Sequence, residues 1–248
     1  MRTRACRPEP ILPYRPRSLG WSLWLALWLV CDAHAAASAP AGKPPYPSSA
    51  DIVYQVVWGL ISLDAEQHWR VDGQHYTLTT ELKLPLGFRS RRYLSQGLIT
   101  EQGLEPSSYQ ELSAADSAPS HQAVFDRSAG QLRYGSPSEM RSVRLDALTQ
   151  DMNGLAFQLA WWGVRSGEPG LPVTNGKGLV RYSFAEPVTT RLDFQGKDYE
   201  AQRQSGSSQE GGLEVWSVPA MAGLPLKVIR SQDGRQLRFI ARSVHIVP

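Results

Sequence analysis

Residues 144–162, RLDALTQDMNGLAFQLAWW, decide the predicted fold, because they are the one stretch of the chain with helical periodicity. Apolar residues recur there at steps of three and four: Leu145, Leu148, Met152, Leu155, Leu159 and Trp162. This spacing places them on one stripe of an α-helix and leaves Gln158 facing solvent. Glycine costs about 1 kcal/mol relative to alanine inside a helix. The Asn153-Gly154 pair therefore predicts that the regular helix can begin as late as Asn153, with Asn153 as the N-cap.

The sequence on either side of this helix alternates between apolar and polar residues, which is the period of β-strands. Turn pairs such as Asn175-Gly176 and Asp233-Gly234 favour hairpins, and the Ser/Gly-rich residues 203–212 are predicted to form a mobile loop. A helix with one apolar stripe has to bury that stripe, and a sheet is the natural cover. We therefore predict a mainly β fold, with a curved antiparallel sheet or open partial barrel and one amphipathic helix packed against its concave side.

The clearest hairpin signal is Asp72-Gly73, a pair typical of type I′ turns between two alternating runs. With this pair as the turn, Trp69 lies opposite Tyr76, and the two runs share one apolar face and one polar face. Further upstream the same strand is apolar on both faces, and Gly59 is predicted to form a bulge or bend within it.

The N-terminus has the pattern of an export signal. A basic region is followed by an apolar core from Leu19 to Val30 and by the small-x-small motif Ala33-His34-Ala35. The apolar run is shorter than the about 20 residues that a membrane span needs. We predict that residues 1–35 are a signal peptide cleaved near Ala35, and that the mature protein is periplasmic, with no transmembrane span.

An alternative is a lipoprotein anchored at Cys31, although Val30 occupies a position where lipoprotein signals carry a small residue. After the signal, residues 36–50 read as a Pro-rich leader and residues 51–248 as a single β-rich domain.

Removal of the signal changes the charge balance. The remaining chain keeps 21 of the 26 basic residues and 21 of the 23 acidic residues, so it is near neutral and lacks the basic excess that nucleic-acid binding requires. Both cysteines, Cys6 and Cys31, lie in the signal, which leaves no disulfide, thiol nucleophile or thiolate metal site in the mature chain. No cofactor or metal is predicted.

Several short motifs occur in an order that resembles an uncharacterised family of exported, periplasmic bacterial β-rich proteins, a domain of unknown function. The matching residues are Tyr54, Ser95, Gly97, Gly103, Leu104, Pro106, Tyr109, Asp151, Trp216, Leu224 and Pro225. The resemblance extends over the predicted mature domain and implies that Asp151 opens a short helix. The chain departs from the family pattern after this residue, where Met152-Asn153-Gly154 stands in place of the usual x-Leu-Ser.

Candidate catalytic residues are weak in this sequence. Two carboxylate pairs are predicted across hairpins, Asp64 with Glu81 and Asp193 with Glu200, and such pairs can hydrolyse glycosides. Both pairs lie on faces expected to be wet, whereas a catalytic acid needs a desolvated environment that raises its pKa. No catalytic residue is assigned, and an enzyme acting on an envelope glycan remains an alternative function.

Aromatic residues are the more informative group. Aromatic side chains mostly serve as apolar core, but a groove between helix and sheet could also use them to bind a ligand. The candidate ligand-binding residues are Trp58, Trp161, Trp162 and Trp216. We predict a non-enzymatic envelope protein that binds or carries an apolar or amphiphilic ligand, or an envelope partner; a purely structural scaffold is the second alternative.

Overall fold

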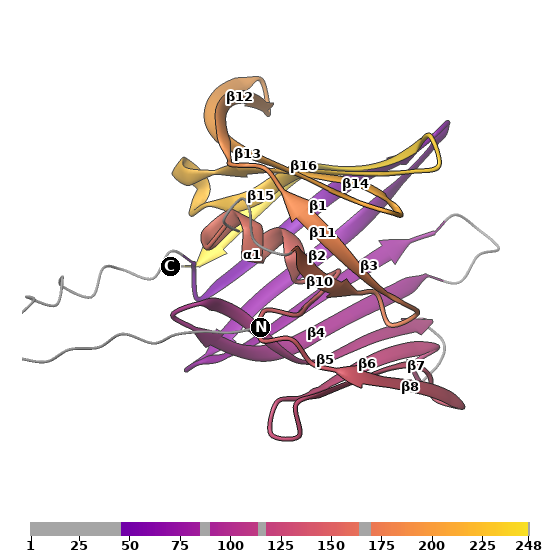
Figure 1. The fold of residues 1–248 in the computed structure, drawn as a ribbon. Helices are drawn as coiled ribbons and strands as arrows, with labels where there is room; N and C mark the ends of the chain where they lie inside the picture. Colours follow the sequence, from indigo (N-terminus) through magenta and orange to yellow (C-terminus); the bar gives the residue numbers. More distant parts are fainter. Residues whose placement is uncertain (1–45, 85–89, 114–117, 164–169, 248) are drawn as a thin grey trace, which may run out of the picture. The chain divides into compact units, whose positions relative to one another are not determined.

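In the part of the chain that the structure describes, sixteen strands form a single curved sheet, and one short α-helix lies on its concave side (Figure 1). The computed structural model describes residues 46–84, 90–113, 118–163 and 170–247. The elements are β1 Ser49–Trp58, β2 Ile61–Asp72, β3 His75–Lys83, β4 Arg91–Thr100, β5 Gly103–Ser113, β6 His121–Asp126, β7 Gln131–Ser136, β8 Glu139–Arg144, β9 Gln150–Asp151, α1 Leu155–Trp161, β10 Leu171–Thr174, β11 Leu179–Phe184, β12 Val188–Phe194, β13 Lys197–Ser208, β14 Gly211–Val218, the 3-10 turn η1 Pro219–Met221, β15 Leu224–Gln232 and β16 Arg235–Val247.

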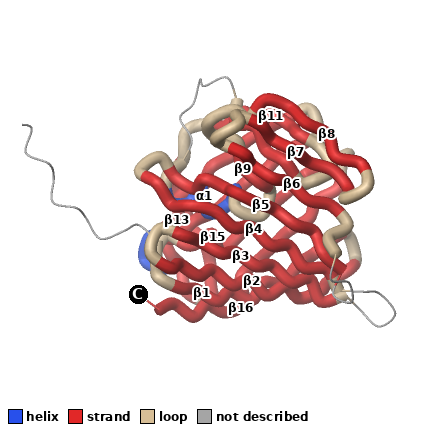
Figure 2. The backbone as a smooth tube through the Cα atoms, turned by 90° about the horizontal axis from the view of Figure 1, so that it is seen from below, coloured by secondary structure: helices blue, strands red, loops and turns tan. Residues whose placement is uncertain are grey.

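The strands lie in the order β8-β7-β6-β5-β4-β3-β2-β1-β16-β15-β14-β13-β11-β10-β9, and β12 pairs with β13 beside this path. Neighbours are antiparallel except β9 and β10, which are parallel, so the sheet is mixed. Figure 2 shows the strands curling around α1. The predicted mainly β fold, with a partial barrel and one helix inside it, is confirmed.

Side chains, not a backbone ladder, connect the last strand to the other wall of the sheet. β9 lies against β5, and Gln150 Nε2 donates to the Leu104 carbonyl over 2.7 Å. Asp151 accepts a hydrogen bond from Ser95 Oγ over 2.6 Å, and Gln158 Oε1 accepts one from the Leu104 N–H over 2.7 Å. We call this group of five residues the seam.

The helix is shorter than predicted, because α1 covers only Leu155–Trp161. Residues 145–149 form no helix, Gln150–Asp151 form β9, and Leu148 is 38% exposed. The helix starts where Asp151 Oδ1 accepts hydrogen bonds from the N–H groups of Asn153 and Gly154, over 2.9 and 2.8 Å. The N-cap residue is Gly154 and not Asn153. A carboxylate that satisfies free N–H groups therefore fixes the start of the helix, as a capping side chain does.

The buried face of the helix includes one residue that was expected in solvent. Leu155 and Leu159 are buried as predicted, but Gln158 is also buried, with 6% exposure. The prediction for Gln158 is wrong because α1 packs against β14 and β15 on one side and β5 on the other, so that two of its faces are covered.

The first hairpin keeps its predicted faces but has a different register. Trp69 lies opposite Leu78, two residues beyond the predicted Tyr76, and the turn consists of Gly73 and Gln74. Gly73 has a φ of 59°, whereas Gln74 has no positive φ, which matches a type II′ turn with glycine first and not the predicted type I′ turn. A shift by two preserves the side-chain alternation, so the apolar face remains buried.

Two further loop predictions are corrected. Gly59 with Leu60 forms a complete turn between β1 and β2, not a bend within one strand. The predicted loop 203–212 is occupied by the end of β13 and the start of β14. Gly206 lies there against Phe184, where an added Cβ would be 2.4 Å from a ring carbon. Gly206 pairs with Phe184 in the β11–β13 ladder, and its missing side chain leaves room for the Phe184 ring.

Candidate functional site

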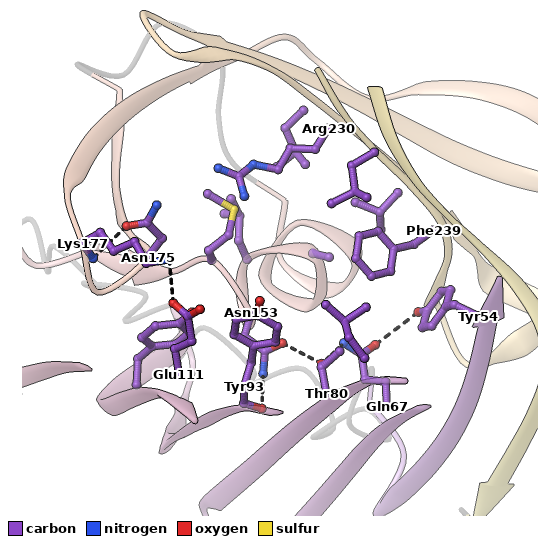
Figure 3. A pocket seen from close by; sticks show the side chains of 18 residues that line it. Tyr54, Gln67, Thr80, Tyr93, Glu111, Asn153, Asn175, Lys177, Arg230 and Phe239 are labelled. Atoms are coloured by element: carbon purple, nitrogen blue, oxygen red, sulfur yellow. Dashed lines mark hydrogen bonds and ion pairs between the residues drawn. The ribbon is translucent and has the colours of Figure 1, made fainter. Parts of the chain in front are cut away.

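A cavity of about 220 Å³ lies between the first turn of α1 and the concave face of the sheet (Figure 3). One wall comes from β1 to β5, with Tyr54, Gln67, Thr80, Leu82, Tyr93, Tyr109 and Glu111. The other wall comes from β14 to β16, with Leu213, Val228, Arg230, Leu237 and Phe239. Residues Met152, Asn153, Leu155, Ala156, Asn175 and Lys177 complete the lining.

Most polar groups of the first wall already have partners. Gln67 Nε2 donates to Thr80 Oγ1 over 2.8 Å, and Thr80 Oγ1 donates to Asn153 Oδ1 over 2.7 Å. Asn153 Nδ2 donates to the Leu78 carbonyl over 3.0 Å. The row is therefore a satisfied network that ties the start of α1 to β2 and β3, and it leaves the adjoining apolar side chains to define the cavity.

Tyrosines at the two sides of this wall are neutral phenols. Tyr54 donates its hydroxyl proton to the Pro225 carbonyl over 2.6 Å, and burial raises its pKa well above the usual value. Burial also raises the pKa of Tyr109 well above the usual value, and the nearby Arg230 guanidinium opposes this rise. These groups add polarity to the wall without adding charge.

Three charged residues line the cavity, and two of them are paired. Glu111 is only 3% exposed, and its carboxylate binds Lys177 Nζ over 2.9 Å and the Arg91 guanidinium. Arg230 extends into the cavity from β15 toward the side where Asn175 and Lys177 lie (Figure 3). Within the described part of the chain, the Arg230 guanidinium has no hydrogen bond or ion pair, whereas the Arg230 backbone pairs with Leu213 and Leu237. The cavity therefore holds one unneutralised cation.

A second set of polar residues is buried next to the start of α1 and does not line the cavity. Tyr76, Ser95 and Asp151 form a buried row, with 3.2 Å between the Tyr76 and Ser95 oxygens and 2.6 Å from Ser95 to Asp151. Burial raises the pKa of Asp151 to about 6, against the opposing effect of its hydrogen bonds from Ser95, Gly154 and Asn153. None of the three lines the cavity, and Ser95 and Asp151 are both 0% exposed. This arrangement organises the helix start and gives no solvent-accessible nucleophile.

The four candidate tryptophans do not line this cavity. Trp161 and Trp162 belong to an aromatic cluster with Tyr46 and Trp69, in which Trp161 stands 4.9 Å from Trp69 between ring centres. Trp216 is 8% exposed and lies beside the Lys227 ammonium, 4.4 Å from the ring centre. The structure therefore uses these three residues as packing within and around the core.

Trp58 occupies a different position. It is 46% exposed at the end of β1, where it lines an outer hollow together with Arg230, Arg235 and Leu237. Arg230 and Leu237 line both this hollow and the cavity. Of the four tryptophans, Trp58 is the one that lies in a hollow sharing residues with the cavity lining.

Arg230 is a site residue that the sequence analysis missed, although a signal was present. Leu226, Val228 and Arg230 follow one another at the strand period along β15, so an arginine occupies a position where the pattern predicts an apolar side chain. A charge on an apolar face is unusual and indicates a specific role.

The predicted carboxylate pairs are not formed. Asp64 lies opposite Lys83, and Glu81 lies opposite Glu66, which is ion-paired with Lys83. The second predicted pair is broken in the same way, because Asp193 lies opposite Asp198 and Glu200 opposite Arg191. The described residues contain no group of three His, Cys, Asp or Glu side chains that could hold a metal ion. None of the described helices has the length and apolar content to cross a membrane.

The chain was compared with protein-family models, curated proteins and solved structures. No protein-family model matches the chain, and no curated protein matches it either. A crystal structure described as a beta-barrel-like protein of a domain of unknown function, DUF1849, from Brucella abortus is similar, with a TM-score of 0.48 and 9% identity. The alignment covers 82% of this chain and 99% of that one. The fold assignment rests on the strands and helix described above.

Proposed function

We propose that this protein is an exported protein of the bacterial envelope that binds an apolar or amphiphilic ligand in the cavity between α1 and the sheet. The observation that carries this proposal is the cavity itself. Protein interiors are close-packed, and voids much larger than a water molecule are few. A volume of about 220 Å³ is far above the roughly 10–15 Å³ that one water requires.

The chemistry of the lining supports a ligand with a large apolar part. Leu82, Leu155, Leu213, Val228 and Phe239 face the space from three sides. The polar residues among them are mainly bonded to one another, as small-molecule sites combine apolar walls with a few fixed polar groups. The export signal pattern in residues 1–35 supports an envelope location, where such ligands are abundant.

A cavity-filling variant tests the proposal. Ala156 lines the cavity from α1, so Ala156→Phe would place a ring in the space that the ligand needs. Val228→Trp fills the same space from the opposite wall. Ala147→Phe is the matched control, because Ala147 is exposed and lies outside the cavity lining.

The measurement is retention of hexadecanol by native mass spectrometry after incubation of the purified protein with this lipid. We expect the unmodified protein and Ala147→Phe to retain it, and both filling variants to lose it while they keep their melting temperature within a few degrees. A protein that retains no hexadecanol would refute the proposal, and so would equal retention by all four proteins, because the cavity would then not be the binding site.

A further inference from the structure

We infer that the ligand of this cavity is a single-chain amphiphile with an anionic head group, a carboxylate or a phosphate, that binds the Arg230 guanidinium. This inference rests on the proposed function and adds the charge and the orientation of the ligand.

The first step is the position of Arg230. Its side chain occupies an inward position of β15 and is partly buried, between the apolar Val228 and the strand end. Among the residues that the structure describes, none accepts a hydrogen bond from its guanidinium. A partly buried arginine without an anion loses hydration and gains no ion pair in return, and this cost is recovered when an anion binds.

The second step is the charge balance of the lining. Glu111 could have neutralised Arg230, but its carboxylate is bound by Lys177 and Arg91. The charged side chains of the lining are Glu111, Lys177 and Arg230, which gives one negative and two positive charges and a net charge of +1. The site is therefore complementary to a ligand with one negative charge.

The third step is the direction of the ligand. Arg230 and Leu237 line both the cavity and the outer hollow beside Trp58, so Arg230 lies where the inner space and the outer hollow adjoin. The apolar residues Leu155 and Leu213 line only the inner space. A head group at Arg230 thus stays near water while its chain extends inward, which is the arrangement with the lowest desolvation cost.

Arginine also suits these head groups by geometry. Its planar guanidinium can donate two parallel hydrogen bonds to two oxygens of one carboxylate or phosphate. A lysine at the same position would keep the charge but lose this fork. The comparison between the two side chains therefore separates charge from geometry.

The experiment measures the affinity of palmitate, hexadecyl phosphate and hexadecanol, which share one chain length and differ in head group, by calorimetry below their micellar concentrations. The key variant is Arg230→Gln, and Arg230→Lys retains the charge. Arg238→Gln is the matched control, because Arg238 is exposed on the neighbouring β16 and lines neither the cavity nor the hollow.

We expect at least one of the two anions to bind the unmodified protein at least tenfold more tightly than hexadecanol. Arg230→Gln should weaken anion binding about tenfold to a hundredfold, the range for a hydrogen-bonded charge pair, and leave hexadecanol binding unchanged. Arg230→Lys should retain part of the preference, and Arg238→Gln all of it.

Four outcomes would overturn the inference. Equal affinity for anions and hexadecanol, or an anion preference that survives in Arg230→Gln, would remove the role of Arg230 while the proposed function stands. Loss of hexadecanol together with the anions in Arg230→Gln would show that the side chain acts through packing. Absence of binding for all three lipids would overturn the proposed function as well.

Discussion

At the scale of single residues, the Asp151 carboxylate joins the segment just before α1 to β4. One carboxylate oxygen accepts hydrogen bonds from the N–H groups of Asn153 and Gly154 just before α1, and the other accepts one from the Ser95 hydroxyl of β4. The side chain is 0% exposed, so its charge is stabilised only by these hydrogen bonds. The resemblance implies that Asp151 opens a helix, whereas Asp151 ends β9 and α1 begins four residues later, at Leu155.

This position predicts a pH dependence of stability. Burial raises the pKa of Asp151 to about 6 from the ordinary 3.8, so the folded protein binds this proton more tightly than the unfolded chain does. The contribution of Asp151 to the free energy of unfolding is therefore largest at low pH, and it falls as the pH rises from about 4 to about 6. The expected fall is roughly 3 kcal/mol by linkage.

Urea unfolding at several pH values, compared with Asp151→Asn, checks this prediction. The amide can keep one oxygen toward the helix N–H groups and donate to Ser95, but it does not titrate. The difference in unfolding free energy between the two proteins should shift in favour of the variant as the pH rises through this window. A difference that stays constant with pH would show that Asp151 titrates normally.

At the scale of secondary-structure elements, alternation in the sequence predicted the faces of the strands better than their ends or partners. The β2–β3 face with Trp69 and Tyr76 is buried as expected, because any register shift by two residues leaves it unchanged. The helix prediction was too long because Leu145 and Leu148 match the helical stripe by chance, although residues 145–149 form a turn and Gln150–Asp151 pair with β10 as β9. Tertiary pairing overrode the local pattern there.

The β2–β3 turn gives a prediction at this scale. Gly73 has a φ of 59° and an added Cβ would meet no atom within 4 Å, so any cost of a larger side chain comes from the backbone alone. Gly73→Val should lower the free energy of unfolding by about 1–2 kcal/mol, the usual cost of this conformation for an L-residue. Gln74→Val, in the same exposed turn, should change it by about 0.5 kcal/mol or less.

Denaturant unfolding of the two valine variants measures this difference. Equal losses would mean that the turn does not hold Gly73 in the left-handed region, and the register assigned to the hairpin would then be in doubt.

At the scale of the whole molecule, the sequence predicted the fold class and suggested a groove between helix and sheet, but it did not predict the residues that line the cavity. Cavity residues such as Tyr54 and Phe239 come from opposite ends of the chain and meet only because β1 pairs with β16. No local pattern contains that pairing. The alternation along β15 did contain one usable signal, the arginine at an inward position. The tryptophan candidates instead included core residues such as Trp161, which packs against Trp69.

The export prediction also belongs to the whole molecule. We expect the secreted form to begin at Ala36 and to carry no lipid, because Ala33 and Ala35 form a cleavage motif and Val30 disfavours lipid attachment at Cys31. Intact-mass measurement of the exported protein tests this. A diacylglyceryl adduct on Cys31 would contradict it, and the Cys31→Ala variant should be processed at the same position as the unmodified protein.

The seam between β5 and β9 has a mechanical consequence. A barrel closed by continuous backbone pairing has a circumference fixed by its strand number and shear. Here the two walls around the cavity are joined by the side chains of Ser95, Gln150, Asp151 and Gln158, whose hydrogen bonds are worth about 1 kcal/mol each. Separating the two walls along the seam therefore costs less free energy than separating two long strands that share a backbone ladder. We expect the two walls to separate first along the seam, with every strand intact.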